Sequence, residues 1–303
     1  IQPAPPTSSS AMLSKLDNFL CCRPYRPELR GFYRFAVEFW FFGLKEARAC
    51  LFAGLFFAAM FAVPKTGVLG LPRYDVLLVF ALAVQIFMVW AKLETWDELK
   101  SVSLFHAVGF VLEVFKTSPE IQAALLPAGS TVRASWAYPD FAYTKVLGVP
   151  LFTGFMYAAV ASYIIQAWRL FRLRVYRMPP YWLTTLAAAL IYLNFFTHHA
   201  IMDLRWYIAS FVLGLYARSY VVFTPYDTPH RMPMLLSFVF IGFFIWLAEN
   251  LGTLLGVWRY PNQIGTWSMV HWGKFGAWSL LVIMTFTIVT HLKHIKETVS
   301  VSR

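Results

Sequence analysis

Long, continuous runs of apolar residues constrain this chain more than any other feature of its sequence. Stretches such as 151–167 and 280–289 contain no charged residue, and they do not alternate between polar and apolar positions. Runs of about 18 apolar residues are typical of membrane-spanning helices, whose backbone groups are satisfied internally, whereas the strands of a membrane barrel alternate. Charged residues make up only 14% of the chain, compared with about 25% in soluble domains. We therefore predict an all-α integral membrane protein.

The apolar runs predict about eight transmembrane helices within one helical domain, residues 46–292. Pro64 and Pro233 fall near predicted ends, where helices tend to stop or start. The flanking regions are predicted to be a disordered tail or cloning remnant (1–12), a basic cytoplasmic segment with an interfacial helix around 35–44 (13–45), and a cytoplasmic tail (293–303). The predicted helices cover residues 46–63, 75–92, 102–117, 147–168, 180–198, 204–223, 233–255 and 267–291.

The distribution of Lys and Arg predicts that both termini lie in the cytoplasm. With the N-terminus inside, 18 of the 26 basic residues fall on the cytoplasmic side, as the positive-inside rule requires. The net charge of +11 lies in short loops and does not form the single basic stripe that nucleic-acid binding needs. We expect a bacterial inner-membrane protein in which Cys21 and Cys22 are candidate acylation sites.

Two parts of the chain resemble each other and predict a parallel internal repeat. The first part contains Gly109, Glu113 and the turn Trp-Ala-Tyr-Pro at 136–139. The second contains Gly242, Glu249 and the turn Trp-Arg-Tyr-Pro at 258–261. In both parts a Glu lies near the end of an apolar span, and the Trp-x-Tyr-Pro turn precedes the next span. Internal repeats are common in membrane proteins of this size.

The predicted topology gathers polar side chains of distant spans at the outer leaflet. A charged group at membrane depth costs at least about 2.5 kcal/mol, so such groups are paired, hydrated or functional. Ion pairing within the membrane and solvation of the imidazoles are the alternatives to a functional site. We predict catalytic roles for Glu113, Glu249 and Lys274, substrate binding by Lys116, Trp136, Tyr138, Arg205, Trp258, Tyr260 and Trp278, and metal binding by His198, His199, Asp203 and His271.

Several longer strings resemble one bacterial multi-pass membrane family, the domain-of-unknown-function family eight hundred and seventeen. These strings are residues 110–117, 135–139, 148–157 and 197–206, and the segment from Glu249 to Pro261 with Lys274 also matches. The resemblance covers about residues 28–297 and implies no established activity. A weaker similarity, through the turn at 256–260, is to the membrane-embedded carotenoid cyclases and hydratases. The paired Glu residues of the cyclases are missing after this turn, which puts cyclisation in doubt.

These features favour a membrane enzyme that acts on a lipid or isoprenoid substrate, with membrane lipids as partners. Glu113 and Glu249 would face each other across a pocket as general acid and base, and the histidines would hold zinc or iron. A proton-coupled transporter or channel is the alternative. Haem bound by two axial histidines at the level of His198, His199 and His271 and retinal attached to Lys274 are weaker alternatives. Nucleotide-binding and common hydrolase motifs are absent from the sequence, and nothing in it indicates an oligomeric state.

Overall fold

The computed structural model describes residues 15–21, 23–129, 134–198 and 202–301, with side chains described up to residue 291. The predicted tail 1–12, Cys22 and His199 lie outside the described residues. The chain is mostly helical, as predicted. Its helices are α1 (Lys15–Cys21), α2 (Gly31–Ala49), α3 (Leu51–Ala62), α4 (Arg73–Trp90), α5 (Trp96–Thr117), α6 (Pro119–Leu125), α7 (Gly154–Leu170), α8 (Tyr181–Thr197), α9 (Arg205–Tyr216), α10 (Met234–Leu254) and α11 (Gly273–Val301), with single 3-10 turns η1 (Leu151–Thr153) and η2 (Pro261–Gln263).

Four segments of the described chain are helical, long and apolar enough to cross a membrane: Arg73–Trp90, Leu151–Leu170, Met234–Leu254 and Gly273–His291. The helices α3 and α8 are apolar but shorter. Each of the eight predicted spans overlaps one helix from α3 to α11, with α6 excepted, and the first span also overlaps the end of α2. The helix α5 is long enough, but charged residues at both of its ends lower its hydropathy.

The prediction of a helix over 204–223 is wrong in its last part. The helix α9 ends at Tyr216, and a strand follows. This strand, β4 (Tyr220–Phe223), lies between β3 (Arg174–Tyr176) and β5 (His230–Pro233) in a small antiparallel sheet. A short apolar run rich in Val fits a strand as well as a helix, and only its pairing partners decide between the two. A second, two-stranded sheet pairs β1 (Lys145–Val146) with β2 (Val149–Pro150).

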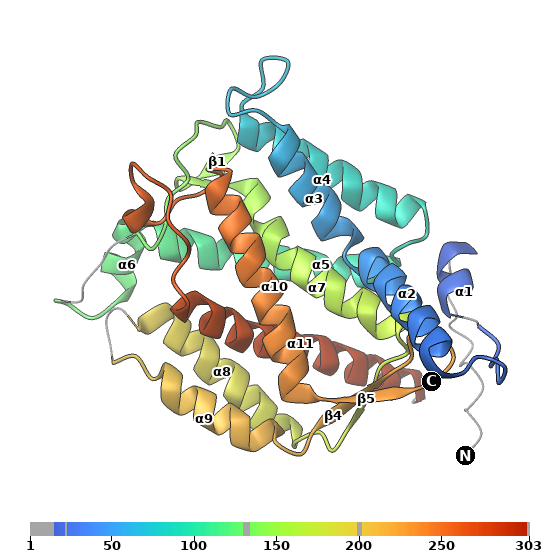
Figure 1. Cartoon of the computed structure of the whole chain (residues 1–303). Helices are drawn as coiled ribbons and strands as arrows, with labels where there is room; N and C mark the ends of the chain where they lie inside the picture. The colour runs from blue at the N-terminus through green and yellow to red at the C-terminus, as the bar shows by residue number, and fades with distance from the viewer. Residues whose placement is uncertain (1–14, 22, 130–133, 199–201, 302–303) are drawn as a thin grey trace.

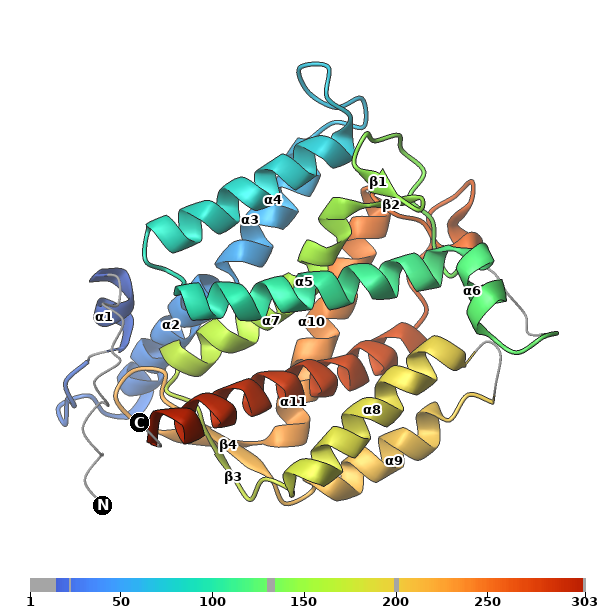
Figure 2. The same ribbon diagram turned by 180° about the vertical axis from the view of Figure 1, so that it is seen from behind.

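Figures 1 and 2 show how the helices are arranged around two crossing pairs. The helix α5 packs on α7, and α10 packs on α11, in the middle of the molecule. The pair α3 and α4 covers one side of this centre, and α8 and α9 cover the other. The sheet β3–β4–β5 lies at one end of the bundle, and α6, β1 and the chain after α10 lie at the opposite end. The loops and short elements that connect the helices thus gather at two opposite ends of the bundle.

Glycines allow both central pairs to cross closely. A Cβ atom on Gly109 of α5 would lie 2.5 Å from the Tyr157 ring of α7. A Cβ atom on Gly242 of α10 would lie 2.3 Å from the Ser279 hydroxyl of α11. Both distances are shorter than any packed contact, so only glycine fits at either crossing without displacing its neighbour.

Ion pairs hold the end of the molecule that carries the three-stranded sheet. Asp17 of α1 is fully buried, and its carboxylate accepts hydrogen bonds from Arg48 at 2.9 Å and Arg169 at 3.2 Å. Asp227, in the turn between β4 and β5, pairs with Arg34 of α2 at 2.8 Å. These contacts fix α1, α2 and the sheet against the bundle.

Candidate functional site

Glu113 lies near the C-terminal end of α5 and is only 2% exposed. Its Oε2 atom accepts hydrogen bonds from the Trp136 indole at 2.8 Å and the Tyr138 hydroxyl at 2.7 Å. Its Oε1 atom accepts one from the Tyr157 hydroxyl at 2.8 Å. Burial, with the Glu113 charge beside it, raises the pKa of Tyr138 well above its usual range. Tyr138 therefore stays protonated and donates, so Glu113 anchors the turn at 136–139 to α5.

Glu249 makes equivalent contacts at the C-terminal end of α10. Its Oε1 atom accepts hydrogen bonds from the Trp258 indole at 3.1 Å and from the Tyr260 hydroxyl. Burial and the neighbouring Glu249 charge raise the pKa of Tyr260 well above its usual range, so this phenol also remains a donor. Each of the two Glu side chains thus accepts hydrogen bonds from the Trp and the Tyr of the Trp-x-Tyr-Pro turn that follows it in the chain.

The two turns are joined directly to each other. The Ala137 N–H donates to the Arg259 carbonyl at 2.9 Å, and the Arg259 N–H donates to the Ala137 carbonyl at 3.0 Å. These two bonds form an isolated antiparallel bridge, and they place the rings of Trp136 and Tyr260 edge to face with centroids 6.1 Å apart. Segments more than a hundred residues apart therefore form one continuous aromatic surface.

Lys274, in the first turn of α11, lies against this aromatic surface. Its Nζ atom is 4.9 Å from the Trp136 ring centroid and 4.7 Å from that of Tyr260. The faces of both rings carry negative potential and attract a cation. The charges of Glu249 and Glu113 also act on the ammonium group. Aromatic faces and two buried carboxylates thus favour the ammonium form of Lys274, while burial and the charge of Arg205 act against it.

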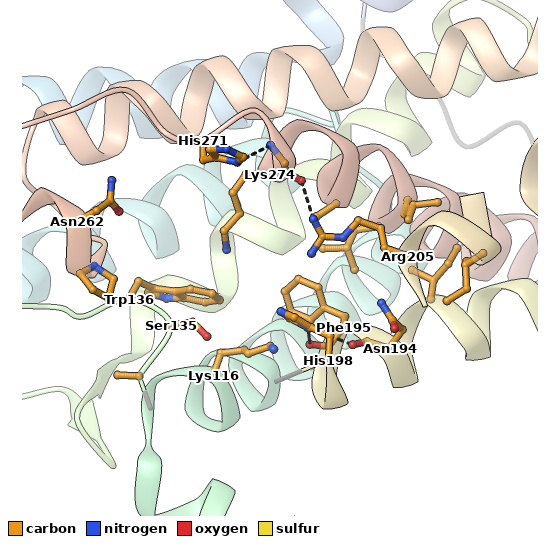
Figure 3. Close-up of a pocket in the computed structure, with 18 residues that line it drawn as sticks. Lys116, Ser135, Trp136, Asn194, Phe195, His198, Arg205, Asn262, His271 and Lys274 are labelled. Atoms are coloured by element: carbon orange, nitrogen blue, oxygen red, sulfur yellow. Dashed lines mark hydrogen bonds between the residues drawn. The ribbon is translucent and has the colours of Figure 1, made fainter. Parts of the chain in front are cut away.

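A cavity of about 360 Å³ opens beside Lys274, between α5, α8, α9 and α11 (Figure 3). Its apolar wall includes Ile191, Ile208 and Leu281, and its polar lining includes residues from four helices and three loops. Six of the predicted site residues line it: Lys116, Trp136, His198, Arg205, His271 and Lys274. The structure therefore brings together residues from four predicted spans and from the loop between the third and fourth spans.

The cavity lining includes neither Glu113 nor Glu249. Both carboxylates lie behind the aromatic surface, bound to their turns, and this differs from the expected pair facing each other across a pocket. The indole of Trp278 lies beside Tyr157, with ring centroids 6.2 Å apart. The cavity lining likewise leaves out Tyr138, Trp258, Tyr260, Trp278 and Asp203.

Arg205 is held in place by neighbours on both sides. One terminal nitrogen donates to the Gly273 carbonyl at 3.2 Å, and the other pairs with the Asp203 carboxylate at 3.3 Å. Asp203 also accepts hydrogen bonds from the Asn194 side chain and the Arg205 backbone N–H. Arg205 is therefore fixed at the edge of the cavity with part of its hydrogen-bonding capacity already used.

The imidazoles predicted to bind metal point to backbone groups. Nδ1 of His198 lies 3.1 Å and 3.0 Å from the carbonyl oxygens of Asn194 and Phe195. Nδ1 of His271 accepts a hydrogen bond from the Gly273 N–H at 3.0 Å. Within the described ranges, no three or more His, Cys, Asp or Glu side chains gather in a way that could hold a metal ion. With His199 outside those ranges, the zinc or iron site remains a prediction.

Sequence reasoning missed Tyr157, Ser135, Asn194 and Asn262. The first completes the Glu113 cluster, and the other three line the cavity. A hydroxyl within an apolar run was the available signal for Tyr157. The two asparagines and the serine lie at loops or helix ends, where such residues are ordinary, so no local signal distinguishes them.

Comparisons with known proteins agree with the resemblance seen in the sequence. A family model described as a protein of unknown function (DUF817) matches residues 38–286. The uncharacterised protein YoaT of Bacillus subtilis (strain 168) is 45% identical over 256 residues, which cover 84% of this chain and 92% of YoaT. No solved structure matches, and the similarity to carotenoid cyclases and hydratases is not supported. The chain therefore belongs to the DUF817 family, whose matched region contains both Glu clusters and every described residue of the cavity.

Proposed function

We propose that this protein is a membrane-embedded enzyme that acts on a lipid or isoprenoid substrate bound in the cavity beside Lys274. The observation that carries the proposal is the composition of the cavity wall. Ionisable side chains cover one part of it and aliphatic side chains of α8, α9 and α11 cover another. A site with both kinds of wall suits an amphipathic molecule, whose polar and apolar ends need different surroundings.

Lys274 is the group that we assign to proton transfer. Of the three residues predicted to be catalytic, it is the one that lines the cavity. A lysine between aromatic faces and buried carboxylates can hold and release a proton at a defined point. Glu249, whose charge acts on Lys274, is a positioning residue in this proposal. Glu113 anchors the turn that carries Trp136.

The two Glu clusters also support the predicted parallel repeat. Each half supplies a glycine at a helix crossing, a buried Glu, and a turn whose Trp and Tyr donate to that Glu. We further propose eight spans with both termini in the cytoplasm of a bacterial inner membrane. The arrangement in Figure 1 supports this topology, because α1 and the end of α11 lie at the same end of the bundle.

The test incubates the purified protein with a total bacterial lipid extract and follows every lipid species by mass spectrometry. Wild type should convert one lipid class into a product. Lys274→Arg keeps the positive charge but should lose at least about 100-fold in rate, because a guanidinium group does not release its proton. Lys45→Met is the matched control, since Lys45 is fully buried at the other end of the bundle, where it donates to the Thr224 carbonyl.

Three outcomes distinguish the possibilities. Product formation by wild type and Lys45→Met, but not by Lys274→Arg, supports the proposal. Equal turnover by wild type and Lys274→Arg removes Lys274 from proton transfer. Movement of a lipid across proteoliposomes without any new product would replace the enzyme by a transporter. Elemental analysis of the same preparation tests the predicted zinc or iron.

A further inference from the structure

The cavity is strongly asymmetric in charge. Lys116 of α5, Arg205 of α9 and Lys274 of α11 all line it, and its lining in the described part of the chain contains no acidic residue. Figure 3 shows the three side chains extending into the cavity from different sides. Three cations around one apolar-walled space repel one another unless an anion lies between them. The cavity is therefore suited to an anionic group.

Lys116 carries the strongest indication of a ligand. Its side chain is 1% exposed, and its Nζ atom has no hydrogen-bond partner among the described residues. The Phe195 ring centroid lies 4.7 Å from Nζ, while the charges of Lys274 and Arg205 act against the ammonium group. A buried ammonium group without a hydrogen-bond acceptor is costly. An anion in the cavity would remove that cost.

Glu113, three residues before Lys116 on the same helix, does not fill this role. Both oxygens of its carboxylate receive hydrogen bonds from the aromatic cluster, and no ion pair joins it to Lys116 within the described residues. Asp203 is the acidic group whose charge favours the Lys116 ammonium, but its carboxylate pairs with Arg205. Among the described residues no acceptor serves Lys116, and its Nζ atom is therefore available to a bound anion.

The arrangement of the cations favours a phosphate over a carboxylate. An arginine that offers two parallel N–H groups can bind both oxygens of a carboxylate, and it binds a phosphate in the same way. Arg205 already uses its two terminal nitrogens for Gly273 and Asp203. Two lysines and one partly occupied arginine, on three different helices, instead suit an anion that has several oxygens pointing in different directions.

We propose that the cavity binds the phosphate group of a phosphate-bearing amphiphile, with Lys116 as its principal contact and Arg205 and Lys274 completing the charge. The alkyl or isoprenoid chain lies along the aliphatic wall formed by Ile191, Ile208 and Leu281. This inference rests on the amphiphile site of the proposed function, and it names the head group of the bound molecule.

The test measures binding by calorimetry to the full-length protein in neutral detergent at pH 6.5. The probes are dodecyl phosphate, dodecanoate, dodecanol and inorganic phosphate. We expect dodecyl phosphate to bind at least about 10-fold more tightly than dodecanoate. Lys116→Met should weaken its binding by about 10- to 100-fold, the effect of losing one charged hydrogen bond. Lys116→Arg should retain most of the binding, and Lys45→Met should match wild type.

The possible results distinguish failure of the phosphate assignment from failure of the proposed lipid substrate. Equal affinity for dodecyl phosphate and dodecanoate, or for dodecyl phosphate and dodecanol, overturns the phosphate assignment but leaves the amphiphile site intact. Inorganic phosphate binding as tightly as dodecyl phosphate shows a phosphate site that needs no chain, and it contradicts the proposed lipid substrate. Binding of none of the four probes overturns both. Because the comparison of probes uses wild type, it stands even if Lys116→Met does not fold.

Discussion

Replacement of Glu113 tests whether this carboxylate anchors a turn or takes part in a reaction. In Glu113→Ala, three buried donors lose their acceptor: the Trp136 indole and the hydroxyls of Tyr138 and Tyr157. An unsatisfied buried donor costs about 1–3 kcal/mol. We expect Glu113→Ala to lower the free energy of unfolding by at least about 3 kcal/mol. Tyr138→Phe, which removes a single donor, should lower it by about 1 kcal/mol.

The assay is urea unfolding in detergent micelles, monitored by tryptophan fluorescence. Glu113→Gln is an intermediate case, because its amide keeps one acceptor oxygen and replaces the other with a donor. We expect its stability to lie between those of wild type and Glu113→Ala. A Glu113→Ala protein within about 0.5 kcal/mol of wild type would refute the anchoring role. A Glu113→Gln protein of native stability that forms no product would restore Glu113 to the catalytic machinery.

Two further substitutions test the packing and the electrostatics. Gly109→Ala should lower the unfolding free energy by about 1–3 kcal/mol, because its methyl group would overlap the ring of Tyr157. The control is Gly214→Ala, whose methyl group would meet open space and should not lower the unfolding free energy. The melting temperatures of the two variants and of wild type test this difference. Burial by itself would raise the pKa of Asp227, but hydrogen bonds from neighbours, Arg34 among them, hold this pKa below its usual range. Wild type should therefore exceed Asp227→Asn in melting temperature at pH 7 but lose that advantage as the pH falls below about 4; a constant difference would contradict this.

The class of the fold follows from the sequence, because apolar runs and their lengths are local properties. A helix overlaps each predicted run, and Glu113 and Glu249, each of which precedes a Trp-x-Tyr-Pro turn in the sequence, make equivalent contacts with those turns. The strand at 220–223 was missed for a physical reason. One of its two backbone partners, residues 174–176, is distant in the chain, so the local pattern of the apolar run does not separate it from the end of a helix.

The candidate site depends on the tertiary structure to a much greater degree. The sequence by itself determined which groups are costly to bury: two carboxylates, the lysines and the imidazoles of the outer layer. Only the tertiary structure decided that each Glu is satisfied by its own turn, while Lys116 has a buried Nζ without a hydrogen-bond partner in the described part of the chain. The need for a partner is a property of one residue, but the supply of partners depends on helix crossings and turn contacts between segments far apart in the chain. That difference is why, of the three residues predicted to be catalytic, only Lys274 keeps a proposed role in proton transfer.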